Sequence, residues 1–336
     1  MSTKKTIAAA VAITIAGVCA AYWFIFTATN TTGNSQDFNI SIRSDLTIDQ
    51  FLSTSGIPIQ NSSTFQLACL FKRLKRIKPG RYVIGANMSN NQIIQHLRSG
   101  GAPVVQMRID NLDDIFGLAG RLGESLMYDS ASFIDTMLSP NVLSAYETDS
   151  AHLACIIIPN TYEFYWNMSP RTFLDRMKKE HSRVWNDERN ASAQQIGLSP
   201  QEVATLASIV KAETAVVNEA PRIAGLYLNR LRMGMPLQSD PTATFGQKNK
   251  RQRVYHSDLE SENPYNTYKI AGLPPGPINF PEVVYLDAVL QAEKNNYIYM
   301  CAQPGGTGLH NFSSSYAEHT KNRQRYIQWL EEKGIR

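Results

Sequence analysis

The stretch LSPQEVATLASIVKAETAV, residues 198–216, decides how the larger part of this chain is organised. It opens with a helix start signal, which combines Ser199 at the N-cap, Pro200 at the first helical position and Glu202 three residues after the cap. Apolar residues then recur at helical spacing and form a stripe of Val203, Leu206, Ala207 and Val210. The pattern predicts a helix that packs its apolar face into a core.

Glu213 interrupts this stripe. It lies three residues past Val210, where the helical period requires another apolar side chain. Burying a carboxylate costs free energy unless it is paired or neutral, and burial raises its pKa. A glutamic acid that stays protonated near neutral pH is the group needed to protonate a glycosidic oxygen. The alternative is a glutamate at the helix end, either in solvent or paired with Arg222 or Arg230.

The next segment carries polar side chains in a turn. A second helical pattern covers residues 221–231 and ends at Gly234. PLQSDPTATFG follows at 236–246, with Gln238 and Asp240 close together. Asp240 is either a sugar-binding or acid-orienting residue, or only the cap of the turn before the proline that follows it.

A later segment, ENPYNTYKIAGLPPGPI at 262–278, alternates amides, hydroxyls and aromatic rings. Tyr265 and Asn266 lie at its centre. Amides and hydroxyls beside aromatic rings suit N-acetylated sugars. The six histidines are scattered, and His310 is expected nearest the groove, in a structural role.

A run of aromatic residues precedes the first of these segments. LACIII at 153–158 is predicted to be a buried strand, and PNTYEFYW at 159–166 follows it. Tyr162, Phe164 and Trp166 are either the wall of a polymer groove or part of the core.

The N-terminus reads as a membrane anchor. Lys4 and Lys5 precede an uncharged run over residues 7–26, and twenty helical residues span about 30 Å, the thickness of a bilayer core. Tyr22 and Trp23 lie near its far end, where aromatic residues favour the interface. A cleaved signal peptide is the alternative, but no small-x-small cleavage site follows within reach. The lysines predict that the N-terminus is cytoplasmic and the rest of the chain is outside.

Residues 39–109 are predicted to form a small α+β module after a tether at 27–38. Its strands are expected at 39–43, 82–84 and 104–109, and its helices from Thr47, over 65–74 and after Ser89. The module contains a basic run of Lys72, Arg73, Lys75, Arg76, Lys78 and Arg81. We interpret this run as a solvated helix face and turn. Contact with anionic lipid headgroups or an acidic wall polymer is the alternative.

Composition excludes several classes of protein. The chain has 336 residues, enough for two domains of about 150 residues each. Its 33 Lys and Arg against 29 Asp and Glu give a net charge of +4, which argues against a nucleic-acid binder. No CxxC, GxxxxGK[ST] or HExxH motif occurs, so neither a metal nor another cofactor is expected. Cys69, Cys155 and Cys301 have apolar neighbours and are expected to be buried and unpaired, with one disulfide as the alternative.

Four stretches resemble the endolytic murein transglycosylase family, also called YceG-like. They are ASIVKAETA (207–215), LYLNRLRMGMPLQSDPT (226–242), NPYNTYKIAGLPPGPI (263–278) and LHNFSSSYAEH (309–319). KPGRYVI followed by NQIIQHLRSG looks like the LysM-like module of that family. The resemblance covers nearly the whole chain, in the family's order. Departures at Asn160, Ala243 and Phe245 bear on the groove rather than on the acid.

The resemblance implies an α+β fold with an N-terminal transmembrane helix, a small LysM-like α+β module and a larger mixed α+β catalytic domain. The expected boundaries are 1–6 cytoplasmic, 7–26 anchor, 27–38 tether, 39–109 module and 110–336 catalytic domain. It implies a single-pass protein of the cell (inner) membrane, with its bulk on the periplasmic side. Its partners would be peptidoglycan strands, the membrane and peptidoglycan synthases, and not nucleic acid.

The implied activity is endolytic cleavage of nascent strands between N-acetylmuramic acid and N-acetylglucosamine, with 1,6-anhydro ends, which terminates elongation. Glu213 is then the catalytic acid, and the muramic acid's own C6 hydroxyl is the nucleophile. The candidate substrate-binding residues are Gln238, Asp240, Tyr265, Asn266 and Tyr162. A hydrolase that uses Asp240 as second carboxylate, and a non-catalytic wall-binding scaffold, are the competing hypotheses.

Overall fold

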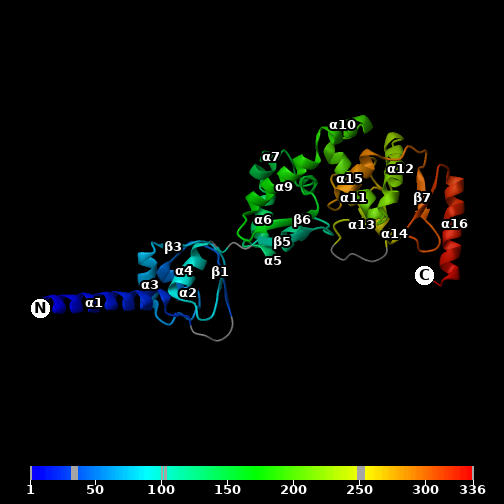
Figure 1. The fold of residues 1–336 in the computed structure, drawn as a ribbon. Helices are drawn as coiled ribbons and strands as arrows, with labels where there is room; N and C mark the ends of the chain where they lie inside the picture. Colours follow the sequence, from blue (N-terminus) through cyan, green and yellow to red (C-terminus); the bar gives the residue numbers. More distant parts are fainter. Residues whose placement is uncertain (1, 32–36, 100, 102–103, 248–253, 335–336) are drawn as a thin grey trace. The chain divides into compact units, whose positions relative to one another are not determined.

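A computed structural model describes residues 2–31, 37–99, 101, 104–247 and 254–334 (Figure 1). Contacts divide the chain into two units. The first comprises Met1–Gln106, Ser125–Met127 and Glu163–Met168, and the second comprises Met107–Glu124, Tyr128–Tyr162 and Ser169–Arg336. The chain contains both helices and strands, which confirms the predicted α+β class. The LysM-like character of the first unit stays a prediction.

The chain begins with an apolar helix. α1 (Ser2–Tyr22) continues without a break into a short π-helix, η1 (Trp23–Thr27). The segment Lys5–Thr27 has a mean hydropathy of 2.1 and is the one helix in the described parts of the chain that is long and apolar enough to cross a membrane. This is consistent with the anchor predicted over residues 7–26.

The first unit is built on two small antiparallel pairs. β1 (Phe38–Ile42) pairs with β4 (Gly80–Ile84), with Ile40 opposite Tyr82, and β2 (Leu46–Thr47) pairs with β3 (Arg76–Ile77). Alternate residues of β4 are buried, as is usual for a strand with one face on a core. The unit's helices are α2 (Ile48–Thr54), α3 (Ser62–Phe71) and α4 (Asn90–Arg98). Each begins after a polar N-cap whose side chain accepts a backbone N–H, namely Thr47, Asn61 and Ser89.

The end of the apolar helix is part of the first unit's core. Phe26 is buried among the core residues of the unit, and Ile25 packs against them. The Asn90 side chain donates a hydrogen bond of 2.8 Å to the Ile25 carbonyl and accepts one of 2.6 Å from Asn30. Asn30 and Thr31, which lie within the predicted tether, are buried too. Residues 32–36 of that tether lie outside the described residues.

From Val104 onward the chain is mostly helical, with two two-stranded sheets, β5–β6 and β7–β8. In chain order the elements are β5 (Val104–Ile109), α5 (Ile115–Ser125), α6 (Ser130–Met137), α7 (Pro140–Ala145), α8 (Leu153–Ile156), β6 (Asn160–Tyr165), α9 (Pro170–Val184), α10 (Asp187–Ile196), α11 (Pro200–Glu213), η2 (Val217–Glu219), α12 (Ala220–Arg232), α13 (Asp240–Thr244), α14 (His256–Leu259), α15 (Val283–Leu290), β7 (Tyr299–Ala302), β8 (His310–Ser313) and α16 (Tyr316–Glu332).

One predicted strand is wrong. Residues 153–156 form the short helix α8, and the strand β6 begins only at Asn160. Local hydrogen bonds close the helical turn, from Cys155 N–H to the His152 carbonyl at 2.9 Å and from Ile157 N–H to the Ala154 carbonyl at 3.1 Å. A short run that is buried on every side has no apolar periodicity, so its sequence does not separate a strand from a buried helix.

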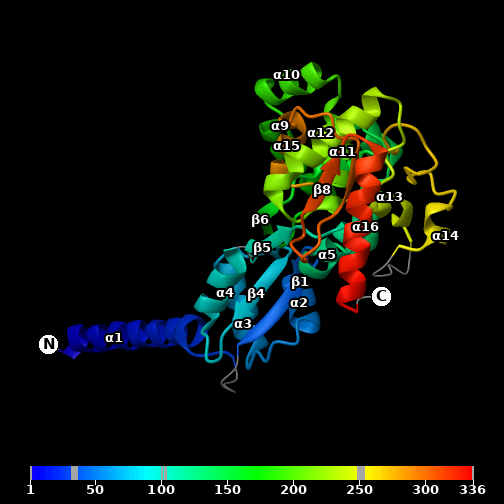
Figure 2. The ribbon, with the colours of Figure 1, turned by 90° about the vertical axis from the view of Figure 1, so that its right-hand side faces the viewer.

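α11 is the centre of the second unit and contacts both α12 and α15 (Figures 1 and 2). Its start is as predicted, because Ser199 and Glu202 form a reciprocal capping box. Every residue from Val203 to Val210 is buried. Glu213 is the last residue of this helix and lies just beyond its buried segment.

The four cysteines are all unpaired, which confirms that part of the prediction for Cys69, Cys155 and Cys301. Cys69 and Cys155 are buried, and burial raises the pKa of both thiols to about 12. Cys301 is only partly buried.

Candidate active site

Glu213 lies where α11 ends. Thr214 has an extended backbone, and its N–H makes the last bond back to the Val210 carbonyl. The Glu213 side chain thereby enters a cavity of about 250 Å³. The cavity is lined by Glu213, Leu226, Tyr227, Arg230, Leu237, Gln238, Asp240, Tyr268, Met300, Cys301, Ala302 and His310. All of these belong to the second unit.

Two hydroxyl groups bind the same oxygen of Glu213. The Tyr227 hydroxyl donates to Oε1 at 2.9 Å, and the Ser239 hydroxyl donates to Oε1 as well. A carboxyl oxygen has two lone pairs, and these two donors use both. When Glu213 is protonated, its proton is therefore carried by Oε2.

The surroundings of Glu213 raise its pKa. Burial is the largest cause, because it disfavours the ionised form. The hydrogen bonds from Ser239 and Tyr227 lower the pKa, the negative charge of Asp240 raises it, and His310 lowers it. The net direction is upward, toward a carboxyl group that keeps its proton at higher pH than a free glutamate does.

The arginines that could have paired with Glu213 have other partners. Arg222 forms an ion pair with Glu293 at 2.9 Å. Arg230 donates to the carbonyls of Leu237 and Ile298, each at 2.7 Å. Burial lowers the pKa of Arg230. The reading of Glu213 as one half of a surface ion pair with either arginine is therefore wrong.

Gln238 and Asp240 both reach the cavity of Glu213. Gln238 has a left-handed backbone (φ 52°), and its side-chain oxygen accepts a 3.3 Å bond from Arg230. Asp240 begins α13 and accepts a 2.6 Å bond from the Tyr268 hydroxyl. The structure thus places the two polar residues of the predicted turn beside the acid. Their roles in binding sugar stay predictions.

The other three predicted site residues lie elsewhere. Asn266 is fully buried and donates to the Leu259 and Ser261 carbonyls. The Tyr265 ring packs 4.5 Å from that of Phe245, beside a separate, wider cavity. The Tyr162 hydroxyl is buried and donates to the Ile158 carbonyl at 2.7 Å. None of the three lines the cavity of Glu213, and their proposed contact with substrate stays a prediction.

Ser239 is a site residue that sequence reasoning missed. It is fully buried, and its backbone N–H donates to the Thr267 hydroxyl at 3.0 Å. The Thr242 hydroxyl donates to the Ser239 carbonyl at 2.6 Å and lies 2.8 Å from the Thr267 hydroxyl. This network links the two polar segments and fixes the direction from which Ser239 reaches Glu213.

Glu219 is the second missed residue. It is buried at the end of η2 and accepts two bonds of 2.8 Å from His310, one from the backbone N–H and one from Nδ1. A carboxylate that accepts from Nδ1 holds the proton on that nitrogen and leaves Nε2 for other contacts. The sequence carried a weak signal for His310 and no signal for Glu219.

Among the described residues, no group of three or more His, Cys, Asp or Glu side chains could hold a metal ion. The side chains around the Glu213 carboxyl group carry hydroxyl, amide, carboxylate and imidazole groups.

Comparison with known proteins gives the family of this chain. The sequence model of the YceG-like family matches residues 43–325. The chain is 27% identical over 293 residues to a Bacillus subtilis (strain 168) protein named "Endolytic murein transglycosylase", a match that covers 82% of this chain and 80% of the relative. It is 24% identical over 311 residues to a protein of the same name from Streptococcus pneumoniae (serotype 2, strain D39), covering 82% of this chain and 55% of that relative.

A solved structure shares the fold. A crystal structure of a YceG-like protein from Listeria monocytogenes superimposes with a TM-score of 0.56. The match has 24% sequence identity and covers 85% of this chain and 98% of the other.

Proposed function

The chain belongs to the YceG-like family, and on this basis we propose that it is a lytic transglycosylase that cleaves peptidoglycan strands internally. The names of the Bacillus and Streptococcus relatives support this activity. The observation that carries the proposal is Glu213, a carboxyl group with a raised pKa at the edge of a polar cavity. Such a group is the general acid that cleavage of a glycosidic bond requires.

The reaction starts with proton donation from Glu213. Because Ser239 and Tyr227 occupy Oε1, Oε2 delivers the proton to the glycosidic oxygen that leaves. The bond between the muramic acid anomeric carbon and this oxygen breaks, with N-acetylglucosamine as the leaving sugar. The two hydroxyl donors then stabilise the carboxylate that remains, because hydrogen bonds to a charged oxygen are stronger than those to a neutral one.

The second half of the reaction closes a ring. The C6 hydroxyl of the muramic acid attacks its own anomeric carbon, and its proton returns to Glu213. The product is a 1,6-anhydro end, and Glu213 regains its initial state. Since the nucleophile belongs to the substrate, a second protein carboxylate is not required, unlike in glycosidases with paired carboxylates.

Neighbouring side chains position the strand and the acid. Gln238 and Asp240 line the cavity and offer an amide and a carboxylate to sugar hydroxyls and N-acetyl groups. His310 lies close enough to lower the pKa of Glu213 and is itself held by Glu219. We assign Glu219 as a positioning residue that acts through His310.

The cellular setting follows from α1. We propose that this helix crosses the cell (inner) membrane once and that both units lie on the periplasmic side, where nascent glycan strands are made. Cleavage there would terminate strand elongation, with peptidoglycan synthases as partners. The single apolar helix supports the anchoring.

Mass spectrometry of digested glycan strands tests the proposal. We expect the full-length protein to release internal fragments with 1,6-anhydro ends, and the Glu213→Gln variant to release almost none. Reducing ends instead would show a hydrolase with Asp240 as its second carboxylate. Intact strands, together with retained binding, would show a wall-binding scaffold.

A further inference from the structure

Helix α3 exposes apolar side chains beside the end of the membrane helix. Leu70 and Phe71 are 74% and 67% exposed at the C-terminal end of α3. The Phe71 ring lies edge-on to the ring of Phe26, with 6.0 Å between centroids. Phe26 belongs to η1, the last turn of the anchor. The exposed apolar residues of α3 therefore adjoin the anchor directly.

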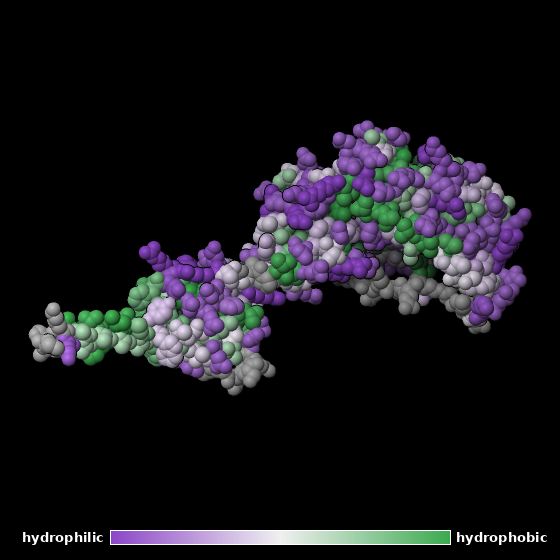
Figure 3. All heavy atoms as spheres, in the orientation of Figure 1, coloured by the Kyte–Doolittle hydropathy of each residue, from purple (hydrophilic) through white to green (hydrophobic). Residues whose placement is uncertain are grey.

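The π-helix η1, at the end of the anchor, also exposes aromatic residues. Trp23 and Phe24, on the π-helix that holds Phe26, are 60% and 55% exposed. Exposed aromatic rings at the end of a membrane-spanning helix lie at the boundary between acyl chains and water. Since Phe71 contacts Phe26, it lies close to this boundary when α1 spans the bilayer. Figure 3 shows hydrophobic surface on α1 and again on the adjoining edge of the unit.

Basic residues follow this apolar group in the chain. The Lys72 ammonium lies 5.7 Å from the centre of the Phe26 ring. Arg73 and Lys75 are exposed, and Arg73 has a left-handed backbone (φ 54°) at the turn that ends α3. Two acidic side chains lie near them: Asp45 pairs with Arg76 at 3.9 Å, and Asp49 accepts from the neutral Gln66 amide at 2.7 Å and keeps its single negative charge. An excess of positive charge therefore remains beside the apolar residues.

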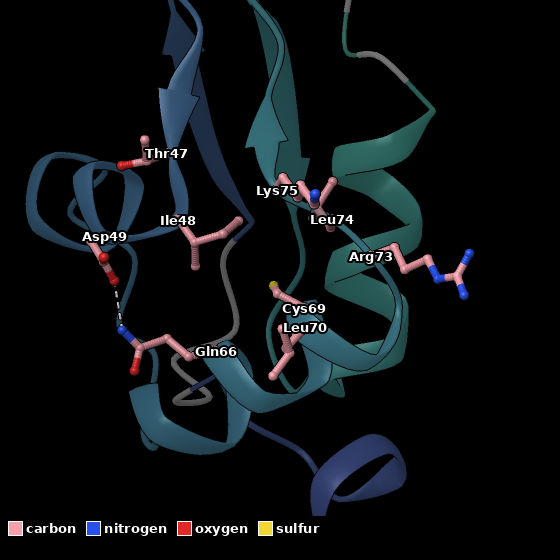
Figure 4. Close-up of a pocket in the computed structure, with 9 residues that line it drawn as sticks. All are labelled: Thr47, Ile48, Asp49, Gln66, Cys69, Leu70, Arg73, Leu74 and Lys75. Carbon is pink, nitrogen blue, oxygen red and sulfur yellow. Dashed lines mark hydrogen bonds between the residues drawn. The ribbon is translucent and has the colours of Figure 1, made fainter.

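A cleft of about 680 Å³ indents this edge between the start of α2 and the end of α3 (Figure 4). Ile48, Leu70 and Leu74 supply its apolar lining, and its charged lining comes from two cations, Arg73 and Lys75, and one carboxylate, Asp49. An apolar recess with cationic neighbours matches the two parts of a phospholipid, the acyl chain and the phosphate.

The alternative interpretation, a solvated helix end and turn, explains only some of the basic residues. Lys72 and Arg73 follow the C-terminus of α3, where cations stabilise the helix dipole. That role explains neither Lys75 nor the exposure of Leu70 and Phe71. Large exposed apolar side chains next to each other usually mark an interaction surface.

We propose that the α3 edge, defined as Leu67, Leu70, Phe71, Lys72, Arg73 and Lys75, docks on the anionic outer surface of the bilayer that holds α1. Leu70 and Phe71 enter the headgroup region, and the three cations bind lipid phosphates. A membrane surface is favoured over an acidic wall polymer because the apolar residues are continuous with the anchor, whereas a solvated polymer offers them no apolar partner. The inference rests on the proposed membrane insertion of α1 and is independent of catalysis.

Tryptophan quenching in the full-length protein tests the docking. Phe71→Trp is reconstituted into vesicles of brominated phosphatidylcholine, with and without phosphatidylglycerol, and its fluorescence is compared with that of the wild type. We expect added quenching that increases with the anionic lipid and decreases with salt, because salt screens the contact. Val83→Trp is the matched control, since Val83 is exposed on the solvent side of β4 and its tryptophan should remain unquenched.

A charge variant tests the cations. Replacing Lys72, Arg73 and Lys75 together by Gln in Phe71→Trp should abolish the lipid-dependent quenching. Each basic residue near an anionic surface shifts the docked population about fivefold, so three shift it by on the order of a hundredfold. The same replacement at Lys321, Arg323 and Arg325 of α16 is the control and should leave the quenching unchanged.

The outcomes separate the docking from the anchor. The difference in quenching between the wild type and Trp23→Phe reports insertion of α1. If the two proteins were quenched equally, both the anchor and the docking would be overturned. If Trp23 were quenched but Phe71→Trp were quenched no more than Val83→Trp, the docking alone would be overturned. Equal quenching with neutral and anionic lipids would overturn the role of the cations. If the charge variant lost binding to purified wall polymer with unchanged quenching, the polymer would be the partner.

Discussion

Glu219 and His310 are joined by two hydrogen bonds of 2.8 Å, although 91 residues separate them in the chain. One bond fixes the backbone at the start of β8, and the other fixes the imidazole ring. His310 also lines the cavity of Glu213 and lowers the pKa of that carboxyl. The electrostatic environment of the proposed acid therefore depends on a buried carboxylate six residues beyond it in the chain.

Glu213→Gln should abolish most of the activity without unfolding the protein. The amide keeps the size of the side chain but cannot donate a carboxyl proton, and loss of a general acid costs about 10²–10⁴ in rate. Burial raises the pKa of Glu213, so the wild-type folded state loses stability as pH rises through that pKa. The variant should then unfold at an equal or higher temperature at neutral pH, with a difference that disappears in acid. Strand turnover and thermal unfolding measure both effects.

Glu202→Gln is the matched control on the same helix. Glu202 accepts from the Ser199 N–H at 2.8 Å in the capping box, far from the cavity. Glutamine can accept the same bond, so we expect near-normal cleavage and a loss of at most about 1 kcal/mol of stability. Near-normal cleavage by Glu213→Gln in the same assay would exclude Glu213 as the acid.

Tyr227→Phe and Asp240→Asn should move the pH–activity profile in opposite directions. An acid works only while protonated, so activity falls as pH rises through the pKa of Glu213. The Tyr227 hydrogen bond lowers this pKa and the Asp240 charge raises it. Removing the hydroxyl should shift the alkaline limb to higher pH, and removing the charge should shift it to lower pH. Shifts in the same direction would contradict this electrostatic account.

Glu219→Gln should reduce kcat with little change in KM. An amide cannot hold the Nδ1–H and the backbone N–H as a carboxylate does, so His310 loses its fixed orientation. A small displacement of a site residue costs up to about a hundredfold in rate, and we expect a loss of ten- to a hundredfold. Glu293→Gln, which breaks only the exposed pair with Arg222, is the control and should act like the wild type. Equal losses in both variants would assign Glu219 a purely structural role.

Phe26→Ala should destabilise the first unit. Phe26 is buried in that unit's core, and removing a buried phenylalanine costs about 3–5 kcal/mol. Phe24 lies two residues earlier and is exposed, so Phe24→Ala should change the stability of the first unit little. Hydrogen exchange of β1 and β4 amides in the full-length protein reports the difference. Equal protection in both variants would show that the anchor's end does not support the fold.

The sequence predicted the element that carries the chemistry because its signals are local. The cap at Ser199 and the stripe from Val203 to Val210 lie within one helix and need no knowledge of the fold. Glu213 was identifiable as a break in that stripe. Gln238 and Asp240 were identifiable as polar residues in a turn after a helix, and the structure places both beside Glu213.

The remaining parts of the site depend on contacts between distant segments. Nothing in the sequence near Glu219 marks it, and Ser239 stands out no more than its polar neighbours in the turn, because the significance of both comes from contacts with His310 and Glu213 in three dimensions. Aromatic residues were ambiguous for another reason. Tyr162 satisfies both the pattern of a buried strand and that of a sugar-stacking wall, and its burial is decided only by packing.

The bond from Asn90 to the Ile25 carbonyl gives the first unit a mechanical property. Because Phe26 is in the core of that unit and the helix runs on without interruption from α1, the junction has torsional stiffness. We therefore expect rotation of the anchor about its own axis to turn the first unit with it. A protein that binds α1 within the bilayer would therefore determine which side of the first unit faces it at the outer surface.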